Sequence, residues 1–279
     1  MANAKRAAQI MQPGPILDDV LHMQNIHRSQ FVWQNEDEAK ILRCQVATNS
    51  LMYANVDERL HNYIRRAGFE EIVKVGGISV DYSLITALVE RWRPETHTFH
   101  LTVGEATITL QDVEVLTGLR VDGNAVTGSA NYNFAQTCEL LLGVVPPPNV
   151  MRGKQIKLTW LDTQFQYLQP NARDDIVRCY ARAFLLRVIG GLLFGGKNSG
   201  YVHFMWLPLL NDFDEAGQYA WGAATLAHLY REMCKATKPD ILQISGCLQL
   251  LQVWACERIP KIAPRAQNQF SMDKSYSFR

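Results

Sequence analysis

Residues 81–119 read DYSLITALVERWRPETHTFHLTVGEATITLQDVEVLTGL, and their hydrophobic period changes twice. In residues 81–93 the apolar side chains recur every 3.6 residues, which predicts an amphipathic helix. Pro94 ends that helix, because proline lacks the amide hydrogen that a further turn needs. A different pattern follows directly.

A β-hairpin is predicted after the helix. Residues 97–103 and 106–110 alternate between polar and apolar side chains around a turn at Gly104 and Glu105. Such alternation is typical of paired strands. A lone hairpin is only marginally stable in water, so we expect this one to pack against helices.

A second helix is expected to begin where the hairpin ends. Thr109 is placed as its N-cap, and Asp112 follows three residues later, which is a variant of the capping box. Beyond that helix, Leu119, Val121 and Gly123 alternate again and are candidates for a short third strand.

Two longer helices are predicted elsewhere in the chain. Residues 172–194 carry the longest apolar stripe, with Asp174 and Asp175 in the first turn, where carboxylates suit the helix dipole. Residues 216–235 include Gly222 and several alanines, so we expect a neighbouring helix to approach closely there. Shorter helices are expected at residues 16–23, 56–67, 134–142, 159–168 and 247–258.

These elements predict a mainly α protein, a single globular helical domain with a small antiparallel β-hairpin or three-stranded sheet packed on it. Residues 146–157, which begin with three prolines, are the strongest candidate for a linker or exposed loop. The composition does not shift across them, which favours one continuous domain over two lobes. We expect residues 1–12 to be a flexible N-terminus, residues 13–264 to be the domain and residues 265–279 to be a flexible tail.

The composition is that of an ordinary folded protein. Of the 279 residues, 47% are apolar and 20% are charged, which excludes collagen-like, coiled-coil and disordered chains. The most apolar stretch, residues 183–196, is too short to span a membrane and carries Arg187. Residues 1–14 hold too little apolar sequence for a secretory signal. We therefore expect no membrane contact and no export, and the six cysteines fit reduced core residues of an intracellular protein.

Charge is distributed unevenly along the chain, although the net charge is only +1. Residues 1–150 hold 12 Lys and Arg against 17 Asp and Glu, a net charge of −5. Residues 151–279 hold 16 against 10, a net charge of +6. This difference can steer a partner or promote head-to-tail association, or it can leave no organised patch on the surface.

The motifs that usually carry chemistry are incomplete. Residues 191–198 fit GxxxxGK, but Asn198 replaces the Ser or Thr of a phosphate-binding loop, and the motif ends a predicted helix instead of beginning one. His97 and His100 would point to opposite faces of a strand, so no metal site is predicted. The sequence contains no GxSxG, HExxH or cysteine-nucleophile signature. We predict no catalytic residue, no cofactor and no enzyme activity.

Basic residues provide the one candidate binding site. Two arginines lie four residues apart on one face of the long helix, and three basic residues crowd the loop after the prolines. A phosphate or an acidic partner could bind there. The helix arginines could equally pair with the aspartates of the first turn or cover the core with their stems. With Arg187, which follows on the same long helix, the candidate residues are Arg152, Lys154, Lys157, Arg178, Arg182 and Arg187.

Several sequence blocks resemble the plant mobile domain family. They run in order from about residue 13 to residue 264, nearly the whole chain, and the ordered series is far more specific than any single block. One departure stands out: residues 194–200, FGGKNSG, replace a turn that is usually of the Pro-Asp-Lys-Ser type. The blocks include HRS at 27–29, LITALVERWRPETHTFHL at 84–101, LTGL at 116–119, WLPLL at 206–210, YAWG at 219–222 and LLQVWACERIP at 250–260.

The resemblance implies a class of function. Members of the family, sometimes labelled aminotransferase-like, occur in plant transposable elements and in nuclear host proteins of the maintenance-of-meristems type. The resemblance links those host proteins to transposon silencing, control of gene expression and genome integrity, and it implies that members act in complexes with one another. A nuclear location is implied as well, although the sequence shows no nuclear-localisation run.

No catalytic residue transfers from the family. Some members are fused with a phosphatase-7-type module, but this chain contains no GDxHG, GDxVDR or GNHE block of such phosphatases. It also shows no recognisable lysine context for pyridoxal phosphate. Three hypotheses remain. The first is a non-enzymatic interaction domain that binds another plant mobile domain protein, with DNA or a chromatin-associated protein as a further partner, and the second is a domain of transposon origin whose basic C-terminal half binds DNA. The third is a degenerate enzyme, which would need a deep pocket with convergent polar groups and shifted pKa values.

Overall fold

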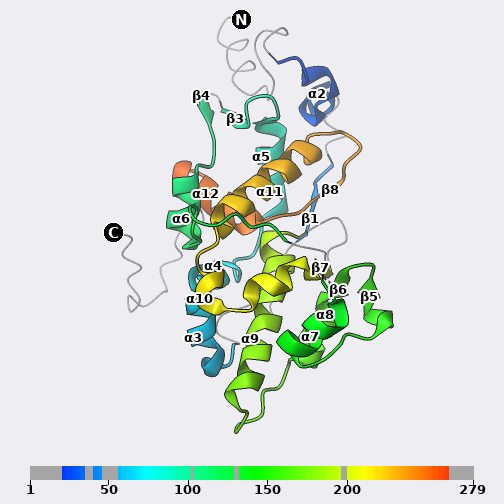
Figure 1. Ribbon diagram of the computed structural model, residues 1–279. Helices are drawn as coiled ribbons and strands as arrows, with labels where there is room; N and C mark the ends of the chain where they lie inside the picture. The colour runs from blue at the N-terminus through cyan, green and yellow to red at the C-terminus, as the bar shows by residue number, and fades with distance from the viewer. Residues whose placement is uncertain are drawn as a thin grey trace, which may run out of the picture.

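The computed structural model describes residues 21–34, 40–45, 56–101, 104–128, 132–195 and 200–263 (Figure 1). Helices dominate these residues and the strands are short, which confirms the predicted mainly α fold. The α-helices are α2 (Arg28–Gln34), α3 (Glu58–Arg66), α4 (Glu70–Val75), α5 (Tyr82–Arg91), α6 (Leu110–Thr117), α7 (Phe134–Leu142), α8 (Leu158–Gln164), α9 (Asp174–Val188), α10 (Phe213–Ala216), α11 (Trp221–Ala236) and α12 (Leu248–Arg258).

Short turns and strands connect these helices. The 3-10 helices are η1 (Gln24–Ile26), η5 (Pro148–Val150) and η7 (Phe204–Leu210), and η6 (Ile189–Leu193) is a π-helix. The strands are β1 (Arg43–Cys44), β2 (Trp92–Arg93), β3 (Thr98–Leu101), β4 (Gly104–Ala106), β5 (Met151–Arg152), β6 (Gln155–Lys157), β7 (Tyr201–His203) and β8 (Gln243–Ile244).

Helix α9 is the centre of the lower half of the molecule in Figure 1, where it contacts α3, α7, α8 and η7. This helix corresponds to the long helix predicted at residues 172–194, and it continues as the π-helix η6. The buried apolar side chains of the described residues form one continuous cluster that runs from Leu42 to Ala255. A continuous core of this kind favours one domain over two lobes.

A hairpin and the helix after it form, but the predicted turn was wrong: Gly104 and Glu105 belong to β4, and residues 107–110, predicted as part of the second strand, lie beyond it. Strands β3 and β4 pair antiparallel, with Phe99 opposite Ala106. Thr109 caps α6 by accepting a hydrogen bond from the backbone N–H of Asp112, and the Asp112 carboxylate in turn accepts one from the backbone N–H of Thr109. Each side chain thus satisfies a backbone donor that the first helical turn leaves open.

The third strand of this sheet is not the predicted one. It is β2, which directly follows α5 and pairs with β3 so that Trp92 lies opposite Phe99. Pro94 explains this, since the residue before a proline avoids helical geometry and becomes extended. The prediction for residues 119–123 was wrong: Leu119 is buried beside α6, and the nearest pairing is an isolated bridge between Asn124 and Tyr219.

A second three-stranded sheet occupies the stretch predicted as a linker. Residues 151–157 form β5 and β6, and β7 completes the antiparallel order β5-β6-β7. Gly153 makes the tight turn between β5 and β6, because its φ of 58° is one that side-chain-bearing residues rarely adopt. Ile156 and Val202 are opposite each other and buried, which seats the sheet on the core.

The third sheet joins distant parts of the chain, since β1 and β8 pair in parallel. Of the helix predicted at residues 16–23, only 21–23 are among the described residues, and they are not helical. The predictions for residues 1–12 and 265–279 lie outside the described residues. Four of the six cysteines are buried and all six are free thiols.

A buried polar cluster fixes the N-terminal segment to the hairpin. His27 Nε2 donates a hydrogen bond to the carbonyl oxygen of Trp92 at 2.8 Å, because a carbonyl can only accept. Arg93 Nη1 lies 3.2 Å from His27 Nδ1 and 3.4 Å from Ser29 Oγ. Burial, reinforced by the charge of Arg93, lowers the pKa of His27 to about 3, so the imidazole is neutral in the folded protein.

This cluster predicts a pH-dependent stability. The unfolded chain binds a proton on His27 below a pKa of about 6.5, whereas the folded protein does not until about 3, so stability falls as the pH drops through that window. Between pH 7.5 and pH 5, His27 removes about 2 kcal/mol from the free energy of unfolding. Urea unfolding of the wild type and of His27→Gln at both pH values measures this difference. Between the two pH values, the unfolding free energy of the variant is expected to fall by about 2 kcal/mol less than that of the wild type. An equal loss in both proteins contradicts the prediction.

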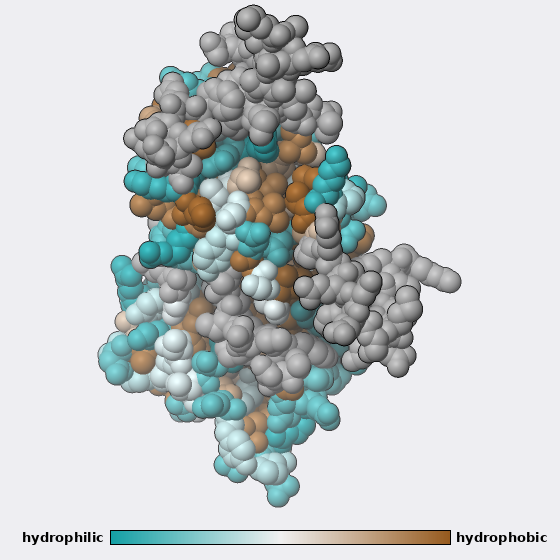
Figure 2. Space-filling model, turned by 180° about the vertical axis from the view of Figure 1, so that it is seen from behind, coloured by the Kyte–Doolittle hydropathy of each residue, from teal (hydrophilic) through white to brown (hydrophobic). Residues whose placement is uncertain are grey.

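On the face of the molecule opposite to the one seen in Figure 1, some apolar side chains reach the surface. Figure 2 shows them gathered in the upper half of this face, bordered by hydrophilic side chains. None of the helices among the described residues has the length and apolar character needed to cross a membrane.

Candidate functional site

The β5-β6-β7 sheet gathers three of the predicted binding residues. Arg152, Lys154 and Lys157 lie on β5, on the turn and on β6, and all three are exposed. We call these three residues the basic sheet face. Among the ion pairs of the described residues, neither Arg152 nor Lys157 takes part.

The register places further polar side chains beside these basic residues. Gln155 on β6 is opposite His203 on β7, and Lys157 is opposite Tyr201. Successive residues of a strand point to opposite faces, so these four side chains share the face that Ile156 and Val202 do not use. The sheet therefore presents basic, amide and aromatic groups on one side.

A pocket of about 640 Å³ lies between this sheet and α11, and we call it the sheet–helix pocket. Helix α11 contributes Ala224, Ala227, His228 and Arg231, which follow the i, i+3, i+4, i+7 spacing of one helix face. The other lining residues are Val126, Gln155, Gly190, Phe194, Tyr201, Val202, His203 and Trp206.

Both histidines of the pocket use one ring nitrogen for a hydrogen bond to the backbone. The backbone N–H of Met205 donates to His203 Nδ1 at 3.1 Å, so the ring proton of His203 is on Nε2. Burial, followed by the charge of Lys154, lowers the pKa of His203 and keeps it neutral. His228 Nε2 donates to the carbonyl oxygen of Gly195 at 3.1 Å.

Aromatic rings form the deeper wall of the sheet–helix pocket. Phe194 and Trp206 are half-buried, and their ring centroids are 5.1 Å apart with the planes tilted by 41°. The ring of His228 meets Phe194 edge-on, with centroids 5.6 Å apart. The pocket thus combines aromatic surface with a small number of polar groups, as ligand sites usually do.

The helix arginines do not join this site. Arg182 is buried and donates to the carbonyl oxygens of Leu210 and Leu141 at 3.0 and 3.2 Å. Arg178 forms an exposed ion pair with Asp174, at 2.8 Å between Nε and Oδ2. The six predicted residues therefore divide into the basic sheet face and separate structural contacts on α9.

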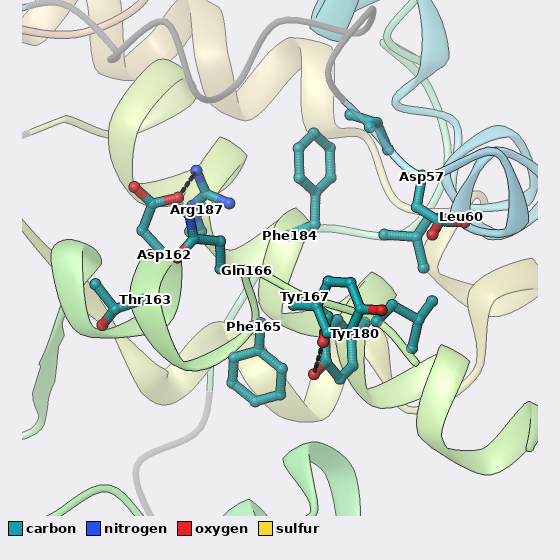
Figure 3. A pocket seen from close by; sticks show the side chains of 12 residues that line it. Asp57, Leu60, Asp162, Thr163, Phe165, Gln166, Tyr167, Tyr180, Phe184 and Arg187 are labelled. Atoms are coloured by element: carbon teal, nitrogen blue, oxygen red, sulfur yellow. Dashed lines mark hydrogen bonds and ion pairs between the residues drawn. The ribbon is translucent and has the colours of Figure 1, made fainter. Parts of the chain in front are cut away.

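Arg187 lies in a second pocket, of about 650 Å³, between α3, α8 and α9 (Figure 3). Its Nη2 is 2.6 Å from Asp162 Oδ1, and its side chain is only 11% exposed. Burial lowers the pKa of Arg187, an effect that the Asp162 carboxylate opposes. At the other end of the pocket the Tyr180 hydroxyl donates to the carbonyl oxygen of Tyr167 at 2.7 Å.

The described lining of the sheet–helix pocket includes neither a carboxylate nor a cysteine, and its titratable side chains are Tyr201, His203, His228 and Arg231. The described residues also contain no group of three or more His, Cys, Asp or Glu side chains that could hold a metal ion. His97 lies in the turn before β3 with φ 54°, not in the predicted strand, and His100 Nδ1 is 3.9 Å from Glu105 Oε1.

Comparison with known proteins gives the family. The model described as plant mobile domain matches residues 68–278. The chain belongs to the plant mobile domain family. This plant mobile domain is 46% identical to the serine/threonine-protein phosphatase 7 long form homolog of Arabidopsis thaliana over 249 residues, which cover 89% of this chain and 19% of that protein.

Two further relatives from Arabidopsis thaliana support the same family assignment. Protein MAIN-LIKE 1 is 41% identical over 87% of this chain, and protein MAINTENANCE OF MERISTEMS is 37% identical over 85%. The chain spans about half the length of these two relatives, 48% and 49%, and about a fifth of the first. No solved structure matches it.

The sequence of this plant mobile domain did not lead us to predict most of the residues that line the sheet–helix pocket. The alanines of residues 216–235 were interpreted as a helix contact, and at Gly222 a close approach does occur, since an added Cβ would be 2.8 Å from the carbonyl oxygen of Leu119. Ala224 and Ala227 line the pocket instead. The signal that could have found it is the spacing of these alanines with His228 and Arg231.

One glycine controls the position of the sheet. A Cβ at Gly190 would lie 2.4 Å from Val202 Cβ, so Gly190→Ala forces β7 away from η6. We expect a loss of about 1–3 kcal/mol in unfolding free energy from this overpacking. Gly195→Ala is the matched control, because its Cβ would meet no atom closer than 3.6 Å. Chemical denaturation of both variants measures the difference, and equal stabilities would show that the contact is not tight.

Proposed function

We propose that this plant mobile domain is a non-enzymatic interaction domain of a nuclear protein and that it binds another plant mobile domain protein. The observation that supports this is how the interior ionisable groups are used. Arg182 holds backbone carbonyls, Glu232 accepts from Ser245 Oγ at 2.8 Å, and His27 holds the hairpin. These groups have structural partners that a reaction would have to break.

The cysteines support the same proposal. Burial raises the pKa of Cys44, Cys138 and Cys247 to about 12, and those of Cys179, Cys234 and Cys256 also rise because of burial. Only the thiolate form is a good nucleophile, so these thiols are unreactive at neutral pH. The phosphatase in one relative's name belongs to that protein, of which the match covers 19%.

A surface for the partner is available beside β1 and β8. Ile41 and Leu242 are 59% and 51% exposed and line one shallow hollow together with Lys40, Arg43 and Asp240. Exposed apolar side chains with a charged border are typical of protein interfaces. For the whole protein we propose a role in nuclear gene control and transposon silencing, in line with relatives named for meristem maintenance.

This proposal predicts a specific association. Light scattering after size exclusion, with the chain alone and mixed with the matching segment of protein MAIN-LIKE 1, is expected to show a complex. Leu242→Asp places a charge in the apolar patch and is expected to weaken the complex at least tenfold. Val115→Asp is the matched control, since Val115 is an apolar residue of similar exposure, 59% against 51% for Leu242, but lies on α6. Monomers in every mixture contradict the proposal.

A second candidate function is DNA binding by the basic sheet face. Arg152, Lys154 and Lys157 are gathered on one small sheet in the half of the chain whose net charge is +6. Such side chains neutralise phosphates and release counterions, which makes binding depend on salt. This is the specific observation that favours the DNA hypothesis.

Three phosphate contacts set the expected salt dependence. The affinity for a labelled duplex should fall about 40-fold between 50 and 200 mM salt. Arg152→Gln together with Lys157→Gln should flatten this slope, whereas Lys238→Gln together with Lys261→Gln, at exposed positions elsewhere, should not. Fluorescence anisotropy measures both. Undetectable binding at 50 mM salt would reject this function.

A further inference from the structure

The sheet–helix pocket is a hollow that this chain leaves open. Ala224 and Ala227 give α11 short side chains where its face meets the pocket, and Gly190 contributes no side chain at all. The remaining space, about 640 Å³, is in the usual range for sites that hold small molecules or parts of larger ones.

The walls suit a flat ring. Phe194 and Trp206 are half-buried and line the hollow, so part of their surface is available to a ligand. Aromatic side chains bind the π-faces of bases by stacking, whatever the base. A flat heteroaromatic ring is therefore the ligand shape that this wall recognises best.

The polar groups suit a ring whose edge both donates and accepts hydrogen bonds. His203 carries its proton on Nε2 and is a donor, whereas His228 uses Nε2 for Gly195, which leaves its Nδ1 for a ligand. Gln155 adds an amide that can do both. Nucleobases have this combination of groups on their edges.

Charge indicates what the ring is attached to. Arg231 lines the pocket, the described lining contains no carboxylate, and the basic sheet face starts at Lys154 and Lys157, on either side of the lining residue Gln155. A base with phosphates on the sheet side matches this arrangement. A base within a duplex is paired and stacked, and cannot enter such a pocket unless it leaves the helix.

We propose that the sheet–helix pocket binds one unpaired base of a single-stranded nucleic acid whose phosphates lie on the basic sheet face. The proposal rests on the second candidate function, binding of nucleic acid by that face, and it adds a preference for single strands. Trp206 and Phe194 stack with the base, and His203, His228 and Gln155 hold its edge.

The experiment compares a labelled 12-nucleotide single strand of mixed sequence with the duplex of the same sequence, by fluorescence anisotropy at 50 mM salt. The wild type should bind the single strand more tightly than the duplex. Trp206→Leu should weaken single-strand binding about tenfold and leave duplex binding unchanged. Trp160→Leu is the matched control, because Trp160 is also half-buried but lies on α8 and does not line the pocket.

A second variant covers the case in which Trp206→Leu destabilises the fold. Ala227 is exposed at the mouth of the pocket, so Ala227→Phe fills the hollow without removing a core contact. It should cause the same selective loss of single-strand binding. Thermal unfolding of each variant shows whether it is folded before its affinity is compared.

The outcomes separate this proposal from the function on which it rests. Two results together support both proposals. The double variant Arg152→Gln with Lys157→Gln loses binding of the single strand and of the duplex, and Ala227→Phe loses binding of the single strand alone. Equal affinity for the two ligands that does not change in Ala227→Phe overturns the pocket proposal and leaves nucleic-acid binding standing. If neither the single strand nor the duplex binds detectably, both proposals are rejected. Displacement of the strand by an equally charged phosphoserine peptide at the same concentration overturns the assignment to a base.

Discussion

The arrangement of the site depends on one close contact, that of Gly190 in η6 with Val202 in β7. The sheet can approach the end of α9 only because residue 190 has no side chain, since an added Cβ would lie 2.4 Å from Val202 Cβ. This contact seats β5-β6-β7 at a fixed distance from α11. It thereby creates the hollow between them and places Tyr201 and His203 at its edge. Packed interiors tolerate few such substitutions, so a single position controls the geometry of the whole face.

Local sequence signals predicted the parts of the fold that depend on near neighbours. The bounds of α7 and the capping box of Thr109 and Asp112 are set within a few residues, and both formed as expected. Strands of two or three residues are too short to show a period. For that reason β2 was missed, the stretch after the prolines was interpreted as a linker, and residues 119–123 were wrongly given the place of the third strand.

The candidate site was predictable only where its residues are close in sequence. Arg152, Lys154 and Lys157 stand together in the chain and also in the structure. Spacing alone could not distinguish Arg178 from Arg182, because the same helix face meets solvent at one turn and buried backbone carbonyl oxygens of α7 and η7 at the next. The sheet–helix pocket is made by four separate segments, so no local pattern reveals it. Its lining of aromatic rings and a few polar groups suits the binding of a ligand. In the rest of the domain, the interior ionisable groups make structural contacts, which also agrees with a role in binding.

We propose that this plant mobile domain acts by binding, through two separate surfaces. Backbone hydrogen exchange, measured for the protein alone, with the MAIN-LIKE 1 segment and with the single strand, tests this most directly. The partner segment is expected to slow exchange in residues 40–45 and 240–244, and the single strand in residues 151–157 and 200–206. Slowed exchange in the same segments with both ligands, or in neither pair of segments, would contradict the account.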